Sequence, residues 1–130
     1  MHLGYTILYV DDVPSSLTAW EAAFGLTRKF LHPSGAYGEL DTGATTLSFA
    51  DREFGRGHFT DETTLAMFDG PPARFEIGLV TDDVDGAWSR ALENGMVPVV
   101  PPAVKPWGQT VAWVRDPEGI LIELASPMGE

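Results

Sequence analysis

Two stretches of the chain share one pattern of hydrophobic and polar positions. Residues 5–13 read YTILYVDDV and are echoed by residues 76–84, EIGLVTDDV. Each stretch reads as an apolar strand that ends in two aspartates and leads into a helix, because hydrophobic residues then recur at helical spacing. Those residues are Leu17, Trp20 and Phe24 in the first copy and Val84, Trp88, Ala91 and Leu92 in the second. Gly25 and Gly95 suit the two helix ends.

Three short strands are predicted after each helix. They span about 28–32, 37–41 and 45–50 in the first copy, and about 97–100, 109–115 and 120–125 in the second. Turn-forming residues separate them, including Pro33-Ser34-Gly35, the pair Pro101-Pro102 and the stretch Asp116–Gly119. The chain is therefore predicted to contain the order β-α-β-β-β twice, which belongs to the α+β class.

A single domain is expected over residues 1–130. Within it we expect module one at 1–50, a connecting loop at 51–73 and module two at 74–130. The connecting loop lacks a clean hydrophobic period and is predicted to have no regular structure. A loop of this length is often functional, although a plain crossover explains it equally well.

Composition and charge narrow the possible partners. The net charge is −11 and only eight residues are Lys or Arg, which argues against nucleic acid and anionic membranes as partners. The same field attracts cationic small molecules, although acidity also serves solubility alone. The chain has no cysteine, which excludes disulfides and thiolate zinc sites. Because the first apolar strand follows Met1 without a basic leader, a cytoplasmic protein is expected.

The chain end carries the most specific motif. It runs from Trp107-Gly108-Gln109 to Asp116-Pro-Glu-Gly119 and then to Glu123-Leu124. With the paired strand-Asp-Asp-Val-helix openings, this ending resembles the vicinal oxygen chelate superfamily of glyoxalases, bleomycin-resistance proteins and extradiol dioxygenases. The resemblance covers nearly the whole chain, and it implies curved half-barrels of mixed strands, paired in a homodimer with two equivalent cavities. The Trp-Gly-Gln stretch is also similar to mitomycin-resistance-type members, in which an aromatic residue of this loop helps to sandwich a drug.

The resemblance also implies where a metal would be held. In the catalytic families, the first and last strand of each module each supply one ligand to a divalent metal, usually His, Gln or Glu. The corresponding residues are Tyr5, Ser48 or a neighbour of it, Glu76 and Glu123. Two of the four, Glu76 and Glu123, are carboxylates, whereas the hydroxyls of Tyr5 and Ser48 are weak ligands. We therefore expect neither a metal nor a cofactor, and we expect the three histidines to lie at the surface.

Strand parity selects the residues expected to line a pocket. Alternation places Tyr5, Ile7 and Tyr9 on the face away from the helix. Glu76 and Glu123 are expected to share a concavity and to raise each other's proton affinity, which suits a general base, a bound cation or a loosely held hard metal. The predicted ligand-binding residues are Tyr5, Tyr9, Tyr37, Glu39, Phe49, Phe54, Phe59, Glu76, Trp107, Gln109, Trp113 and Glu123.

Three functions are compatible with these residues. The preferred hypothesis is metal-independent binding and sequestration of a hydrophobic or aromatic small molecule, cationic compounds included, as in the resistance-type members. The alternative is a metal-dependent glyoxalase-type lyase, isomerase or epimerase that uses Glu76 and Glu123. A structural dimer without any small ligand is the third, and its sign would be a cavity filled by side chains. The fold hosts catalysts and binders alike, so the question of enzyme or binder stays open.

Overall fold

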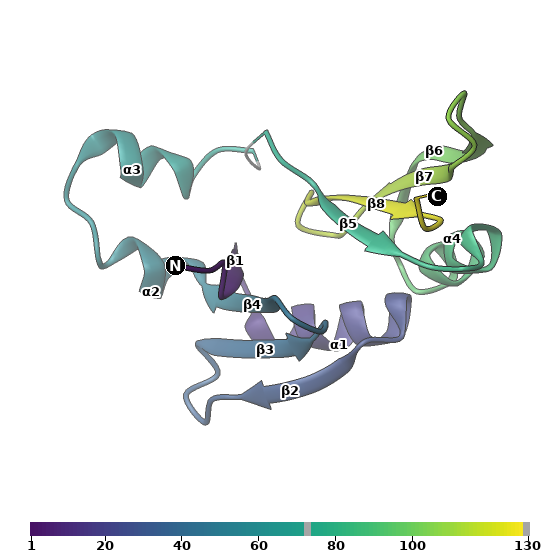
Figure 1. Ribbon diagram of the computed structural model, residues 1–130. Helices are drawn as coiled ribbons and strands as arrows, with labels where there is room; N and C mark the ends of the chain where they lie inside the picture. Colours follow the sequence, from purple (N-terminus) through teal and green to yellow (C-terminus); the bar gives the residue numbers. More distant parts are fainter. Residues whose placement is uncertain (72–73, 129–130) are drawn as a thin grey trace. The chain divides into compact units, whose positions relative to one another are not determined.

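The computed structural model describes residues 1–71 and 74–128 and consists of two compact units, residues 1–71 and 72–130. Each unit contains one four-stranded mixed sheet and one long helix (Figure 1). The predicted α+β class and the repeated β-α-β-β-β order are confirmed. None of the described helices is long and apolar enough to cross a membrane.

The first unit forms a sheet with the strand order β1-β4-β3-β2. Strand β1 pairs in parallel with β4, and the other neighbours are antiparallel. The elements of this unit are β1 (Tyr5–Val10), α1 (Val13–Phe24), β2 (Thr27–Leu31), β3 (Tyr37–Asp41), β4 (Thr46–Asp51), α2 (Arg52–Arg56) and α3 (Glu62–Met67). Helix α1 packs on one face of the sheet, and the opposite face is called the open face of the unit below.

The second unit repeats this topology with the strand order β5-β8-β7-β6. Strands β5 and β8 are parallel, and the remaining neighbours are antiparallel. Its elements are β5 (Ile77–Val80), α4 (Val84–Glu93), β6 (Val97–Val104), β7 (Thr110–Arg115) and β8 (Leu121–Ala125). Helix α4 packs against β6, β7 and β8, so this unit also has an open face on the other side of its sheet.

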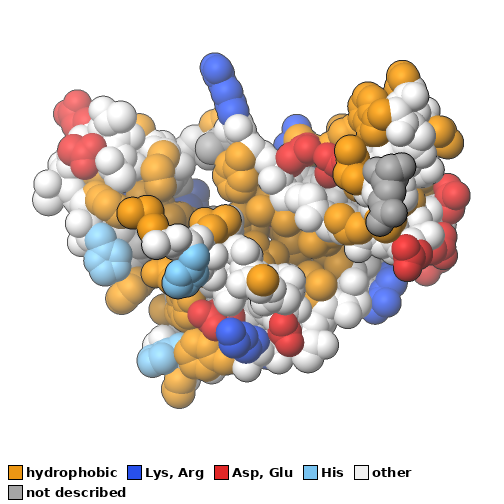
Figure 2. Space-filling view, viewed as in Figure 1, with side chains coloured by type: hydrophobic (Ala, Val, Ile, Leu, Met, Phe, Trp, Pro, Cys, Tyr) orange, Lys and Arg blue, Asp and Glu red, His pale blue; other side chains and the backbone are white. Residues whose placement is uncertain are grey.

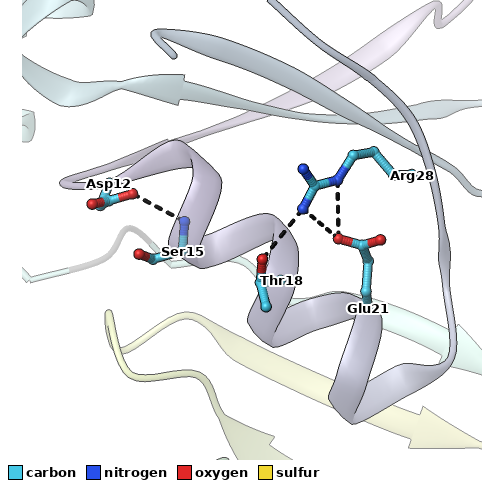
Figure 3. Close-up of polar contacts among 5 residues, drawn as sticks. All are labelled: Asp12, Ser15, Thr18, Glu21 and Arg28. Atoms are coloured by element: carbon cyan, nitrogen blue, oxygen red, sulfur yellow. Dashed lines mark hydrogen bonds and ion pairs between the residues drawn. The ribbon is translucent and has the colours of Figure 1, made fainter.

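An aspartate directly before each long helix, Asp12 before α1 and Asp83 before α4, explains why both helices begin where they do. The Asp12 carboxylate accepts a hydrogen bond from the Ser15 N–H at 2.9 Å (Figure 3), and Asp83 accepts one from the Gly86 N–H at 2.9 Å. Each cap satisfies a backbone donor that has no partner within the helix. Helix α1 ends at Gly25, whose φ of 68° suits a residue without a side chain.

One ion pair ties α1 to the strand that follows it. Arg28 on β2 donates from Nη2 to Glu21 at 2.6 Å and to the Thr18 hydroxyl at 3.3 Å (Figure 3). A second donor of the same guanidinium, Nε, reaches the same Glu21 oxygen at 3.0 Å. All three side chains lie on the helix side of the sheet, so Arg28 does not contribute to the open face.

The core of the first unit lies between α1 and its sheet. Leu8, Val10 and Trp20 are at most 2% exposed, as the alternation in β1 and the helical spacing predict. The structure corrects the predicted placement of Phe49, which was expected to line the pocket. Its side chain is fully buried, with its ring 5.4 Å from that of Trp20 in an edge-on contact. Phe49 therefore belongs to the core on the helix side.

Two boundaries differ from the sequence prediction. Strand β6 was expected to end before Pro101-Pro102, yet it continues to Val104. The prolines are accommodated because β6 is an edge strand and its register with β7 shifts between Val100 and Ala103. The other difference is the connecting segment, which was predicted to lack regular structure and contains α2 and α3. Residues 72–73 of that segment, and 129–130 at the chain end, lie outside the described residues.

Candidate functional site

The open face of the second unit brings two glutamates and a tryptophan together. Trp113 on β7 lies opposite Glu123 on β8, and Glu123 lies opposite Gly78 on β5. Glu76 is two residues before Gly78 and therefore projects to the same face. The Trp113 indole Nε1–H donates a hydrogen bond of 2.8 Å to the Glu76 carboxylate. Three separate segments thus supply one polar cluster.

The two carboxyl groups of this cluster interact directly. The pKa of Glu123 is raised by its hydrogen bond to Glu76, by partial burial and by repulsion from the Glu76 charge. The proximity of the Glu76 carboxylate therefore favours the protonated form of Glu123 relative to an isolated glutamate. Glu76 and Glu123 lie on the same face of the sheet, as expected, and the direction of the Glu123 pKa agrees with the expected repulsion. That they bind a ligand stays a prediction.

The raised pKa of Glu123 makes stability depend on pH. Because the pKa of Glu123 is higher in the folded chain, its stabilising contribution is complete below the unfolded pKa of about 4.3 and is lost as the pH rises through the folded value. In Glu123→Gln the side chain stays uncharged. We expect the difference in free energy of unfolding, variant minus wild type, to increase from pH 4 to pH 7. Urea denaturation of both proteins measures it. Glu93→Gln, which changes an exposed glutamate of α4, is the control, and an equal gain in both variants would contradict the raised pKa of Glu123.

A second polar arrangement lies at the hairpin that joins β6 and β7. The Trp107 indole Nε1–H donates to the Gln109 side-chain oxygen at 2.9 Å. The Gln109 amide nitrogen donates to the Ser126 carbonyl at 2.8 Å. Lys105 places its ammonium 5.6 Å from the centre of the Trp113 ring, at the distance of a cation–π contact. Trp107 itself is 61% exposed.

The open face of the first unit carries hydroxyl groups and one carboxylate. The Tyr37 hydroxyl donates to Glu39 at 2.6 Å and lies 2.9 Å from the Ser48 hydroxyl. Burial raises the pKa of Tyr37, and the hydrogen bond to Glu39 and its charge raise it further. Lys29 is 3.9 Å from the other Glu39 oxygen. Tyr37 is therefore a neutral donor throughout the physiological pH range.

The aromatic residues predicted at the edges of this face have different roles. Tyr5 is 59% exposed. Tyr9 packs edge-on against Phe68 with ring centres 4.7 Å apart, and Phe59 adds its ring 5.9 Å from that of Phe68. Phe54 lies at the surface with its ring 5.2 Å from that of His58. The connecting segment thus covers Tyr9.

A glycine and two arginines hold the connecting segment in place. A side chain at Gly55 would meet the Tyr9 ring at 2.5 Å, so only glycine permits this approach of α2. Arg52 contacts Asp11 at 2.7 Å and donates to the Phe68 carbonyl at 3.0 Å. Arg56 pairs with Asp69 at 2.6 Å. The segment is therefore a packed part of the first unit.

The described donors do not fit a transition-metal centre in either unit. Ser48 is fully buried and hydrogen-bonded to Tyr37, and Glu76 accepts a hydrogen bond from the Trp113 indole. No group of three or more His, Asp or Glu residues is arranged to hold a metal ion in the described parts of the chain. All three histidines are exposed, as predicted, and pale-blue side chains are visible at the surface in Figure 2.

Sequence reasoning missed four residues of these arrangements. They are Lys29, Phe68, Lys105 and Ser126. Ser126 acts through its backbone carbonyl and its hydroxyl, which accepts from the Thr110 N–H at 2.9 Å, so residue type gave no signal. For Phe68, the signal was present, because it is a large aromatic residue in a segment that was predicted to be a loop. The long side chain of Lys105 reaches Trp113 only because the hairpin folds back.

Comparisons with known proteins place this geometry in one family. A family model described as the Glyoxalase/Bleomycin resistance protein/Dioxygenase superfamily matches residues 2–124. No curated protein matches the sequence. Similar solved structures include a glyoxalase/bleomycin resistance protein/dioxygenase family enzyme from Burkholderia phytofirmans PsJN, with 20% identity, 97% of this chain and 98% of that chain covered, and a TM-score of 0.81.

Two further structures support the same fold. A glyoxalase-related enzyme from Fulvimarina pelagi is 15% identical over 98% of this chain and 88% of its own, with a TM-score of 0.81. TioX from Micromonospora sp. ML1 is 21% identical over 97% of this chain and 98% of its own, with a TM-score of 0.71. At these identities the likeness concerns the fold alone. The match over residues 2–124 shows that the chain belongs to the Glyoxalase/Bleomycin resistance protein/Dioxygenase superfamily.

Proposed function

We propose that this protein binds and sequesters a hydrophobic or aromatic small molecule without a metal ion. The observation that carries the proposal is the Glu76–Glu123 pair on one face of the sheet, where Glu76 accepts the Trp113 indole N–H and the neighbouring Glu76 raises the pKa of Glu123. A pair of carboxylates with no third His, Asp or Glu arranged beside it among the described residues is a poor ligand set for zinc, iron or nickel. It is a good partner for a ligand that brings its own positive charge.

Aromatic surface and charge support this function. Trp107 and Tyr5 are both more than half exposed, and aromatic faces attract planar and cationic molecules. The net charge of −11 adds a long-range attraction for cations. Together they favour a planar ligand with an amine or another cationic group over an anionic one. Binding alone would lower the free concentration of such a compound.

The test uses three planar probes and the protein dialysed against a chelator. We expect the cationic dye proflavine to quench tryptophan fluorescence saturably, naphthoquinone to bind more weakly, and pyrenesulfonate to bind least. Adding zinc, nickel or manganese is expected to leave the proflavine curve unchanged. Absence of saturable quenching by every probe would contradict the proposal, as would binding that appears only after metal addition.

The second candidate is a metal-dependent glyoxalase-type lyase, isomerase or epimerase. Its support is that Glu76 and Glu123 are carboxylates on one face, one of them with a raised pKa, as a general base requires. The structures from Burkholderia phytofirmans and Fulvimarina pelagi are also named as enzymes. Elemental analysis of the purified protein separates the two candidates. Near-stoichiometric zinc, nickel, iron or manganese would favour the enzyme.

The proposal includes a homodimer. Four exposed valines on the edge strand β6 support it: Val97, Val99, Val100 and Val104. Exposed apolar side chains on an edge strand favour pairing with another chain. Sedimentation equilibrium is expected to give twice the mass of the chain, and a monomer at all concentrations would remove this part of the proposal.

A further inference from the structure

The indole of Trp107 is held in one orientation by a short relay of hydrogen bonds. Its Nε1–H donates to the Gln109 side-chain oxygen at 2.9 Å, and the Gln109 amide nitrogen donates to the Ser126 carbonyl at 2.8 Å. The relay runs in one direction only, because the Ser126 carbonyl accepts and the indole N–H donates. The amide of Gln109 therefore has only one orientation that satisfies both neighbours.

The backbone supports the same arrangement. The Lys105 N–H donates to the Gln109 carbonyl at 2.8 Å, and the Gly108 N–H donates to the Lys105 carbonyl at 2.8 Å. Gly108 has a φ of 92°, which a residue with a side chain rarely adopts. The tight turn sets the backbone on both sides of Trp107. With the backbone set in this way, the hydrogen bond to Gln109 is enough to fix the orientation of the Trp107 side chain.

Trp107 and Trp113 differ in whether the faces of their rings are available to a ligand. Trp113 uses its N–H on Glu76, and the ammonium of Lys105 lies over its ring. Trp107 uses its N–H on Gln109, but no ring or cation of the described residues lies over it. With 61% of the residue exposed, the faces of the Trp107 ring are open to a ligand while its hydrogen-bond donor is occupied.

We propose that Gln109 is a positioning residue that presets Trp107 as a stacking surface, so that the ligand is selected by a planar face and not by a hydrogen bond to the indole nitrogen. This inference rests on the proposed binding function. Its physical basis is that a side chain already held in its bound orientation loses less conformational freedom on binding. Gln109 acts through Trp107 and need not touch the ligand.

The test compares the wild type with Gln109→Leu, which has a similar size and no hydrogen-bonding group. In the free protein, the ¹⁵N–¹H order parameter of the Trp107 indole is expected to fall below about 0.6 in Gln109→Leu. The dissociation constant for proflavine is expected to rise about threefold to tenfold. Gln109→Glu keeps an acceptor for the indole but loses the donor to the Ser126 carbonyl, so its indole order parameter is expected to lie between those of the wild type and Gln109→Leu.

The control is Asn94→Leu, which removes another amide whose nitrogen donates to a backbone carbonyl, that of Arg90 at 2.8 Å. It is expected to change neither the Trp107 order parameter nor the proflavine affinity. An unchanged indole order parameter in Gln109→Leu would overturn the proposal, and so would a mobile indole with unchanged affinity. If the wild type binds no probe, the proposed function fails, whereas the order parameters still decide whether Gln109 positions Trp107.

Discussion

Replacing Phe49 with alanine is expected to lower the free energy of unfolding by about 3–5 kcal/mol, the usual loss for a buried aromatic residue. Phe49 is fully buried and packs edge-on against Trp20, which is also fully buried. The substitution leaves a cavity between α1 and β4 that the neighbouring side chains fill only in part. Urea denaturation followed by circular dichroism measures the loss.

Phe54→Ala is the matched control for this substitution. Phe54 was predicted to bind ligand just as Phe49 was, but it is 61% exposed. Its replacement is expected to change the free energy of unfolding by no more than about 0.5 kcal/mol. Equal losses in the two variants would mean that Phe49 is not the core residue described above.

Trp107→Ala is expected to weaken the binding of proflavine about tenfold or more, which corresponds to about 1.4 kcal/mol. The physical reason is the loss of a large aromatic surface whose faces are open. Stability should change little, since the Trp107 side chain is exposed and its hydrogen bond to Gln109 is at the surface. Isothermal titration calorimetry with the chelator-treated protein measures the affinity.

Met67→Ala is the control for Trp107→Ala. Met67 is 58% exposed and lies in α3, and it is not among the predicted ligand-binding residues. We expect its affinity for proflavine to equal that of the wild type. A Trp107→Ala variant that binds as tightly as Met67→Ala would show that the ligand is held without Trp107.

Most of the fold was predictable because its signals are local and occur twice. Aspartate caps, apolar alternation and turn residues each depend on a few neighbouring positions. The connecting segment carried such signals as well, since Asp51 and Asp61 cap α2 and α3 through the N–H groups of Phe54 and Thr64. These helices were missed because they are short and lack an apolar stripe.

Strand alternation predicted part of the site. Applied to β4 as well, it would have placed Phe49 in the core. Ser48 and Phe49 are neighbours in β4, so their side chains must lie on opposite faces. The register pairs Glu39 with Ser48, and it is Ser48 that lies with Glu39 and Tyr37 on the open face. Placing Phe49 with Glu39 was therefore incompatible with placing Ser48 there.

Other features of the site depend on contacts between distant segments. The bond from Trp113 to Glu76 joins residues 37 positions apart, and that from Gln109 to Ser126 spans 17 positions. Residue types indicated that these side chains suit a binding site. Which atoms meet depends on the tight turn before Gln109 and on the register of β7 with β8, neither of which follows from periodicity.

The parallel pairing of β1 with β4 has a consequence for synthesis on the ribosome. Strand β1 leaves the exit tunnel before its partner β4, which lies 41 positions later in the register, and β8 lies 45 positions after β5. Strands β2, β3 and β4 are joined by short turns and can form their antiparallel pairs as they emerge. Each nascent half therefore carries an unpaired apolar strand until its last strand arrives, and a translational pause at that stage would expose the strand to chaperones.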